Sequence, residues 1–271
     1  MIDRQLYNQN GFLLLKRFFH KDEIMRVLEE AKDVFKAQLK RYRLDSEDFT
    51  VEANFDKALY SLFEQDFQEV VNCGKQVQHL ISLHRLGTDP RILDRLRALG
   101  LAFPCISARP VMFFNSRRLA KREEYWRLGA HQDWRSSQGS LDAITIWVPL
   151  VDIDKRLGAL EVIPGSHKWG LLESENVSYY GKISEEITVS EFLPVEVERG
   201  DALVFSSFLV HRSGTNSTES IRWSIHFRYN NLSEQTFINR GYPHPFIYKP
   251  QEELITPQFP EKELLANLFD R

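Results

Sequence analysis

A histidine and an aspartate stand two residues apart in the stretch GAHQDWRSS, residues 129–137. Side chains two apart on an extended chain point to the same side, so His131 and Asp133 can offer an imidazole and a carboxylate to one metal ion. The pair alone is weak evidence, because a chain with eight histidines contains such a pair by chance in roughly every second case. A metal site therefore needs a third ligand from elsewhere in the chain.

The candidate for the third ligand is His211, which follows the apolar stretch VFSSFLV. A histidine that merely ends a strand is the alternative interpretation. Two imidazoles and one carboxylate leave several positions on a metal open, which is typical of non-heme Fe(II) oxygenases. A structural zinc site would need four ligands, usually with sulfur, and neither Cys73 nor Cys105 is placed for one.

Alternation in IRWSIHFRYN, residues 221–230, predicts a strand with one apolar and one polar face. The apolar face would be buried, and the polar face would meet either solvent or a wet cavity. Arg222 lies on the polar face shortly after His211, and its guanidinium suits a bidentate contact with a carboxylate near the metal. Arg228 lies on the same face but roughly 20 Å further along the strand, too far to bind the same small acid.

The first third of the chain has the apolar spacing of helices. Residues 24–35 and 70–84 carry apolar side chains at helical intervals, and Asp89 followed by Pro90 predicts the start of another helix. His84 continues one of these apolar stripes, which indicates a core residue rather than a metal ligand. This part is expected to pack against whatever holds the metal site.

After Gly100 the pattern changes to short apolar runs separated by turn signals. Such a pattern predicts a β-sandwich or barrel, with His131 and Asp133 at its entry. We expect a single domain over residues 1–271, helical to about residue 100, with a β core over about 101–231 and a tail over 232–271 that contains a short helix opened by Pro260. The expected strands cover residues 105–114, 143–153, 159–164, 193–197, 202–207 and 221–229.

The composition is that of an ordinary globular protein and argues against several classes of partner. The chain has 271 residues, 42% of them hydrophobic, with a net charge of −3 and a pI of about 6.3. Without a basic excess, nucleic acid is not expected as a partner. No apolar run approaches the ~18 residues of a membrane span. With no signal peptide and two unpaired cysteines, we expect a cytoplasmic protein that does not bind membranes; the oligomeric state stays open.

Five motifs in a fixed order resemble the phytanoyl-CoA dioxygenase family of Fe(II)/2-oxoglutarate-dependent oxygenases. The resemblance covers roughly residues 10–231, including GFLLLKRFFHKDEIMRVLEEA, which is similar to the family's N-terminal strand and helix. It implies a mainly β protein with flanking helices (α+β), whose core is a double-stranded β-helix, a cupin-like jelly-roll barrel. The motifs are His131-Gln132-Asp133, AITIWVPLVDI, GALEVIPGSH, RGDALVF and HRSGTNS leading to Arg222.

The resemblance also implies roles for single residues. His131, Asp133 and His211 would bind Fe(II). Arg222 would bind the distal carboxylate of 2-oxoglutarate, with Ser213 beside it.

Four further residues fit the family pattern less directly. Trp147 and Gln132 match positions near the cosubstrate, although a packed core tryptophan and a strand-end glutamine are equally good interpretations. His167 of the PGSH motif is expected to shape a turn. Asn115 stands near the place where many family members have a lysine, so whatever that lysine does elsewhere is in doubt here.

The implied reaction uses Fe(II), O2 and 2-oxoglutarate, yields succinate and carbon dioxide, and oxidises a small-molecule substrate. Related halogenases have alanine or glycine at the position of Asp133, so the carboxylate favours hydroxylation, desaturation or ring closure. We expect hydroxylation of an unactivated C–H bond in a small polar metabolite or natural-product intermediate. Two alternatives stay open: a cupin-type metalloenzyme that does not use 2-oxoglutarate, and a non-catalytic binding module built on the barrel.

The stretch NSRRLAKREEYWRLG, residues 115–129, joins a strand to the H-x-D pair and carries five basic residues. One interpretation is a solvated surface loop, because charge runs are usually soluble surface. The other is a lid over the barrel mouth, because the stretch leads directly into His131 and a reactive site must be shielded from water. The lid hypothesis predicts a segment that is mobile without substrate and ordered over it.

Overall fold

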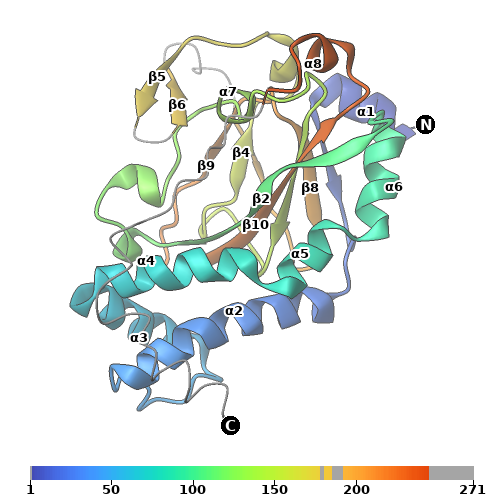
Figure 1. Cartoon of the computed structure of the whole chain (residues 1–271). Coiled ribbons are helices and arrows are strands. Elements are labelled where there is room, and N and C mark those ends of the chain that lie inside the picture. The colour runs from blue at the N-terminus through green and yellow to red at the C-terminus, as the bar shows by residue number, and fades with distance from the viewer. Residues whose placement is uncertain (1, 178–179, 185–191, 244–271) are drawn as a thin grey trace, which may run out of the picture.

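The computed structural model describes residues 2–177, 180–184 and 192–243. Helices dominate up to residue 100 and antiparallel strands follow, as the change of sequence pattern predicts (Figure 1). The helix expected after Pro260 lies outside the described residues. The α-helices are α1 Ile2–Asn10, α2 Lys21–Arg41, α3 Glu52–Gln65, α4 Phe67–Gln76, α5 Ile81–Gly87, α6 Pro90–Leu99, α7 Trp134–Ser137 and α8 Gln235–Asn239.

The strands form antiparallel sheets with the orders β1-β8-β3-β10-β2, β7-β4-β9 and β5-β6. All six stretches predicted as strands contain one. The pair β5 and β6 was not predicted, because SENV and YGKI lack a regular apolar alternation. The strands are β1 Phe12–Leu15, β2 Pro104–Asn115, β3 Ile144–Pro149, β4 Leu160–Val162, β5 Ser174–Val177, β6 Tyr180–Ile183, β7 Leu193–Val195, β8 Ala202–Ser206, β9 His211–Ser213 and β10 Arg222–Asn231.

Local signals set the ends of the predicted helices. The side chain of Asp89 accepts a hydrogen bond from the backbone N–H of Arg91 at 2.9 Å, which caps α6. Pro90 fills the first helical position. Gly100 ends the helix with a φ of 118°, a left-handed conformation that glycine adopts without strain.

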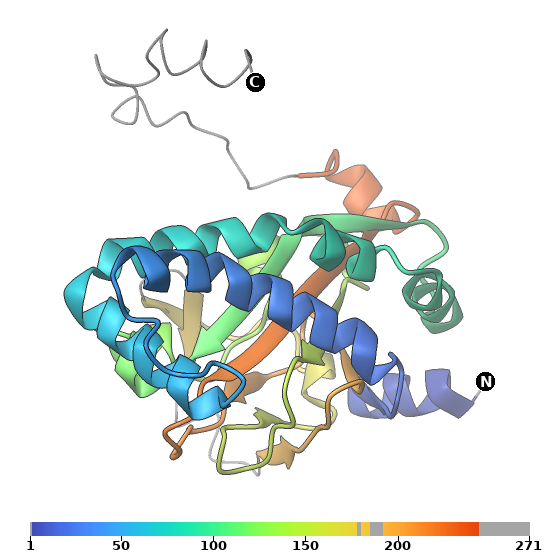
Figure 2. The ribbon, with the colours of Figure 1, turned by 90° about the horizontal axis from the view of Figure 1, so that it is seen from below.

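The helices cover one face of the five-stranded sheet, and α2 runs across its strands (Figures 1 and 2). Trp223 of β10 is fully buried there, with its ring 5.9 Å from that of Phe35 and 6.5 Å from that of Phe55. Further along β10, the hydroxyl of Tyr229 donates to the carbonyl of Gly87 at 2.6 Å. The predicted apolar face of this strand is therefore packed under helices, which leaves its polar face to line the interior on the other side.

Two histidines outside the H-x-D pair have structural roles. Nε2 of His84 lies 3.1 Å from the carbonyl oxygen of Gln78, and Nε2 of His167 lies 3.2 Å from that of Asn8. His167 belongs to a short 3-10 turn, as expected. Both side chains therefore tie neighbouring segments together.

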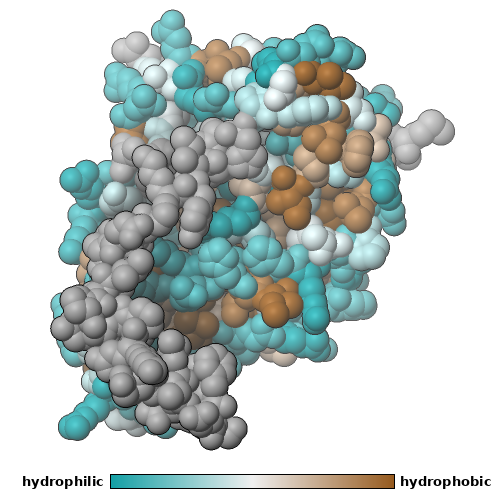
Figure 3. All heavy atoms as spheres, viewed as in Figure 1, coloured by the Kyte–Doolittle hydropathy of each residue, from teal (hydrophilic) through white to brown (hydrophobic). Residues whose placement is uncertain are grey.

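The outer surface is mixed in polarity. In Figure 3 polar side chains make up much of the surface that grey atoms do not cover, and apolar patches interrupt its right half. The exposed large apolar side chains include Phe103 and Ile106 at the start of β2. Among the described residues, no helix is both long and apolar enough to cross a membrane. Cys73 and Cys105 are both free thiols in the structure.

Candidate metal centre and cosubstrate cavity

Three side chains that are distant in the sequence meet in one buried cluster. His131, Asp133 and His211 each offer a ligand atom, and these atoms lie within 4.8 Å of one another. The backbones of the two histidines exchange hydrogen bonds of 2.9 and 3.1 Å, which fixes the spacing between their rings. The structure thus brings the H-x-D pair together with the third candidate ligand.

Hydrogen bonds set the tautomer of both imidazoles. Nδ1 of His131 lies 2.8 Å from the carbonyl oxygen of Gly129, and Nδ1 of His211 lies 3.0 Å from that of Leu209. Because a carbonyl only accepts, each Nδ1 carries the proton and each Nε2 keeps its lone pair. Burial lowers the pKa of His131 to about 3 and also lowers the pKa of His211. Both imidazoles are therefore neutral at pH 7, as metal ligands must be.

Two donors orient the carboxylate of Asp133. The hydroxyl of Thr145 donates to Oδ2 at 2.8 Å, and Arg228 donates from Nε to Oδ2 at 3.1 Å and from Nη2 to Oδ1 at 3.3 Å. Burial acts to raise the pKa of Asp133, but the charge of Arg228 and its hydrogen bond lower the pKa well below its usual range. The group is therefore an ionised and fixed oxygen ligand. Sequence reasoning did not assign either donor to Asp133.

Arg222 is a buried cation without an acidic partner among the described residues. Its Nη1 donates to the carbonyl of Gly158, its Nη2 lies 3.5 Å from the hydroxyl of Ser213, and its Nε has no hydrogen-bond partner. Burial lowers the pKa of Arg222 to about 10, so the guanidinium is charged at neutral pH. A buried unpaired charge is costly, which favours an anionic ligand at this position.

One cavity connects Arg222 with the metal cluster. His226, which lies between Arg222 and Arg228 on the polar face of β10, also faces this cavity. Burial lowers the pKa of His226 well below its usual value, and its Nδ1 has no partner. The cavity therefore presents a neutral imidazole as well as a cation. Its lining residues are Phe113, Asn115, Leu128, His131, Leu160, His211, Ser213, Arg222, His226 and Arg228.

Gln132 and Trp147 do not line this cavity. The Gln132 amide donates to the carbonyls of Gly170 and Phe208 at 2.8 Å each and accepts from the N–H of Leu172 at 2.9 Å. It therefore holds loops around the H-x-D pair, and the strand-end interpretation describes it better than a cosubstrate contact. Trp147 is fully buried in β3, and its Nε1 has no partner among the described residues.

Both ends of the 115–129 segment reach the metal cavity. Asn115 and Leu128 line it, and between them the chain forms two 3-10 turns. Asn115 donates from Nδ2 to the carbonyl of Trp126 at 3.2 Å, so it ties the segment's ends together. Arg118 lies 4.3 Å above the ring of Tyr60, which anchors the segment on α3. The segment therefore begins and ends close to the metal cavity.

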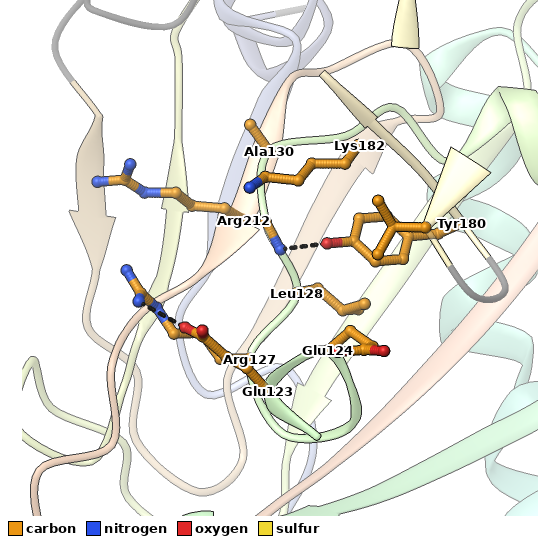
Figure 4. Close-up of a pocket in the computed structure, with 10 residues that line it drawn as sticks. Glu123, Glu124, Arg127, Leu128, Ala130, Tyr180, Lys182 and Arg212 are labelled. Atoms are coloured by element: carbon orange, nitrogen blue, oxygen red, sulfur yellow. Dashed lines mark hydrogen bonds and ion pairs between the residues drawn. The ribbon is translucent and has the colours of Figure 1, made fainter. Parts of the chain in front are cut away.

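A polar hollow of about 340 Å³ lies beside the same segment (Figure 4). Its charged groups are largely engaged, since Arg127 pairs with Glu123 at 3.0 Å. The hydroxyl of Tyr180 accepts from the backbone N–H of Gly129 at 2.9 Å, and the Tyr180 ring lies 5.3 Å from that of His131. Tyr180, in the wall of this hollow, therefore fixes the backbone that leads into His131.

Comparison with known proteins identifies similar sequences and structures. The family model for phytanoyl-CoA dioxygenase (PhyH) matches residues 7–224. A probable phytanoyl-CoA dioxygenase of Caenorhabditis elegans is 25% identical over 252 residues, which cover 87% of this chain and 77% of that protein. The peroxisomal phytanoyl-CoA dioxygenase of Bos taurus is 27% identical over 233 residues, which cover 82% of this chain and 66% of the bovine protein.

A solved structure shares the fold. The epimerase SnoN, in complex with Fe3+, alpha-ketoglutarate and nogalamycin RO, aligns with a TM-score of 0.58 at 18% identity, covering 86% of this chain and 83% of SnoN. At 18% identity this similarity shows the fold alone. The reaction and the substrate of this chain have to be inferred from its own residues.

Proposed function

The chain belongs to the phytanoyl-CoA dioxygenase family of Fe(II)/2-oxoglutarate-dependent oxygenases, and we propose that it hydroxylates an unactivated C–H bond of a small metabolite or natural-product intermediate. When bound, the iron and 2-oxoglutarate supply the activation of dioxygen, with succinate and carbon dioxide as products. The observation that carries this proposal is the buried, unpaired Arg222 in the same cavity as the cluster of His131, Asp133 and His211.

Each residue has a defined task in this proposal. His131 and His211 bind the iron through Nε2, and Asp133 binds it through a carboxylate oxygen. Arg222 holds the distal carboxylate of 2-oxoglutarate with its fork of N–H donors, and Ser213 supplies a hydroxyl beside it. Since each candidate ligand is buried and already hydrogen-bonded in a binding-competent form, the site is preorganised for the metal.

We further propose that the strands form a double-stranded β-helix within one domain over residues 1–271. Support comes from the chain path, in which β3, β8 and β10 lie in the larger sheet and β4, β7 and β9 in the smaller one. The chain thus crosses repeatedly between two sheets. A cytoplasmic location stays a prediction that rests on the sequence alone.

The alternatives fit the site less well. A metalloenzyme that does not use 2-oxoglutarate would leave the buried charge of Arg222 without a partner. A binding module without a metal would have no use for two imidazoles that both point Nε2 into one cluster with a fixed carboxylate. Hydroxylation is favoured over halogenation because Asp133 occupies the position that a halide ion would need.

The test is the absorption spectrum of the purified protein with Fe(II) and 2-oxoglutarate under anaerobic conditions. We expect a weak metal-to-ligand charge-transfer band in the visible, because 2-oxoglutarate bound to Fe(II) at these residues would give rise to such a band. Single alanine variants of His131, Asp133 and His211 should lose both the band and succinate formation, since each removes a ligand. The matched control is His79→Gln, which alters an exposed histidine outside the site. If any alanine variant of His131, Asp133 or His211 forms succinate as fast as the parent, these three residues are not the ligand set.

Arg222 is tested by titrating the same band with 2-oxoglutarate. Arg222→Ala should raise the half-saturation about tenfold or more, equivalent to about 1.4 kcal/mol, because a charge-assisted contact is lost. The half-saturation of Arg222→Lys should lie between those of the parent and the alanine variant, because lysine keeps the charge but cannot make the bidentate contact. An unchanged half-saturation in both variants would transfer this role to another residue.

A further inference from the structure

We propose that an apolar cavity next to the metal site binds the body of the substrate, and that the substrate is an amphipathic molecule with an aromatic or aliphatic body and an anionic group. This inference rests on the proposed function and narrows its substrate class. The cavity has a volume of about 610 Å³, within the range of pockets that hold drug-sized ligands. It lies between helices α3 and α4, strand β2 and the 115–129 segment.

The wall of this cavity is unusually aromatic for a surface that faces water. Phe67 is 36% exposed and Tyr125 is 50% exposed, while the other aromatic side chains are half-buried. An open apolar surface of this kind is unfavourable in water and marks a binding site. The apolar lining includes Phe63, Phe67, Phe113, Phe114, Leu119 and Tyr125.

The apolar cavity shares two wall residues with the metal cavity. Phe113 and Asn115 line both cavities. The ring of Phe113 lies edge-on to that of His226 at 4.9 Å, and His226 faces the metal cavity. A molecule seated against Phe113 would therefore lie close to the residues that line the metal cavity, as a substrate of this site needs.

The rim of the apolar cavity carries a positive charge. Nζ of Lys121 lies 4.0 Å above the ring of Phe67, so the ammonium sits where the aromatic wall meets solvent. Within the part of the chain that the structure describes, Lys121 has no ion pair, whereas Arg122 lies 3.8 Å from Glu124. An anionic group on the substrate would be attracted to Lys121 while the apolar body fills the cavity.

The polar hollow beside Tyr180 is a poorer candidate for the substrate body. Its Arg127 is paired with Glu123, and Arg212 is paired with Glu161 at 2.5 Å. Binding a substrate there would require breaking these contacts.

Two fluorescent probes with the same aromatic body test the inference on the full-length protein loaded with metal and 2-oxoglutarate. 8-Anilinonaphthalene-1-sulfonate carries an anion, and N-phenyl-1-naphthylamine does not. Val71→Trp, which fills the cavity from α4, should raise the Kd of both probes about tenfold or more. Lys121→Glu should raise the Kd of the sulfonate about fivefold and leave the neutral probe within about twofold.

The matched control is Lys75→Glu, the same charge change at an exposed position of α4 outside the cavity lining, which should alter neither Kd. Leu119→Glu places a charge in the cavity wall from the surface segment, and it replaces Val71→Trp if thermal unfolding shows that the larger side chain impairs folding. Unchanged Kd values for both probes in the folded cavity variants overturn the inference.

A nuclear magnetic resonance measurement tests the link to the metal site. Mn(II) in the metal site should broaden the proton signals of bound N-phenyl-1-naphthylamine, and diamagnetic Zn(II) should not. Absence of broadening with an intact Fe(II)/2-oxoglutarate charge-transfer band overturns the substrate role and leaves the proposed function standing. If the charge-transfer band is absent but Val71→Trp still weakens probe binding, the proposed function is wrong and the cavity remains a binding site.

Discussion

Asp133 is held by two residues that lie on neighbouring strands of the larger sheet. Arg228 of β10 and Thr145 of β3 are paired in the sheet register, and both reach the Asp133 carboxylate. An ionised carboxylate in a buried site needs such donors, because water does not solvate it there. Arg228 is therefore a positioning residue, since it acts on the metal through Asp133.

Replacing Arg228 should weaken metal binding. Arg228→Met removes both guanidinium contacts to Asp133, so we expect the Kd for Mn(II), measured by calorimetry, to rise about 10- to 100-fold. Arg228→Lys keeps the charge and should give a smaller loss. Arg135→Met is the matched control, because Arg135 donates to the carbonyl of Leu172 and does not contact Asp133. Equal Mn(II) affinity in parent and Arg228→Met would remove the positioning role.

Residue types and spacing suggested that His131, Asp133 and His211 form one cluster, and the family resemblance implied that Ser213 lies beside Arg222. They were not enough for Thr145 and Arg228, because their contact with Asp133 depends on which residues of β3 and β10 stand opposite each other. Sequence does not reveal that register. Gln132 illustrates the same limit, since its partners lie in loops that only the folded chain brings close.

Helices and strands were predictable where apolar side chains recur at a regular spacing, and they were not predictable where that spacing is irregular. The alternation over residues 221–230 correctly predicted a buried apolar face, but it left open whether the polar face meets solvent or a cavity; the structure turns the polar face toward the site. The helix start at Asp89 was also predictable, because a cap acts locally. The strands β5 and β6 were missed, since their pairing with each other is not encoded in apolar spacing.

The 115–129 segment can be tested as an element. It contains exposed basic residues, and both of its ends line the metal cavity. We expect trypsin to cleave after Arg117, Arg118 or Lys121 more slowly when metal, 2-oxoglutarate and substrate are bound, because ligands would order both ends. Cleavage after Arg43, in an exposed turn after α2, serves as the internal control and should keep its rate. If trypsin cleaves the segment at the same rate with and without ligands, the surface-loop interpretation is correct.

For the molecule as a whole, the two faces of the larger sheet have different functions. One face packs Trp223 and other apolar side chains under the helices, as part of the main hydrophobic core. The other face carries charged and imidazole groups that are buried for binding. The apolar face of β10 therefore stabilises the fold, while the buried imidazoles of the site reduce its stability when they have to be protonated. The free energy of unfolding should consequently depend on pH.

The metal-free protein should lose stability as the pH falls below about 6.5. Burial lowers the pKa values of His131, His211 and His226 in the folded state, while the unfolded chain protonates each near its ordinary value of 6.5. The unfolded state then binds more protons, so the free energy of unfolding falls with decreasing pH, by up to about 1.4 kcal/mol per pH unit for each histidine.

Asp56 opposes this trend between its ordinary pKa of 3.8 and its raised pKa of about 6, because burial makes the folded state take up its proton first. The measurement is urea unfolding with chelator at about pH 7.5 and pH 5.5, where the three histidines outweigh the single aspartate. His226→Asn should show a smaller loss between the two pH values, and His79→Gln, at an exposed position, should lose as much as the parent. A parent protein that is equally stable at both pH values, or a His226→Asn variant that declines as steeply as the parent, contradicts the assignment of neutral buried imidazoles.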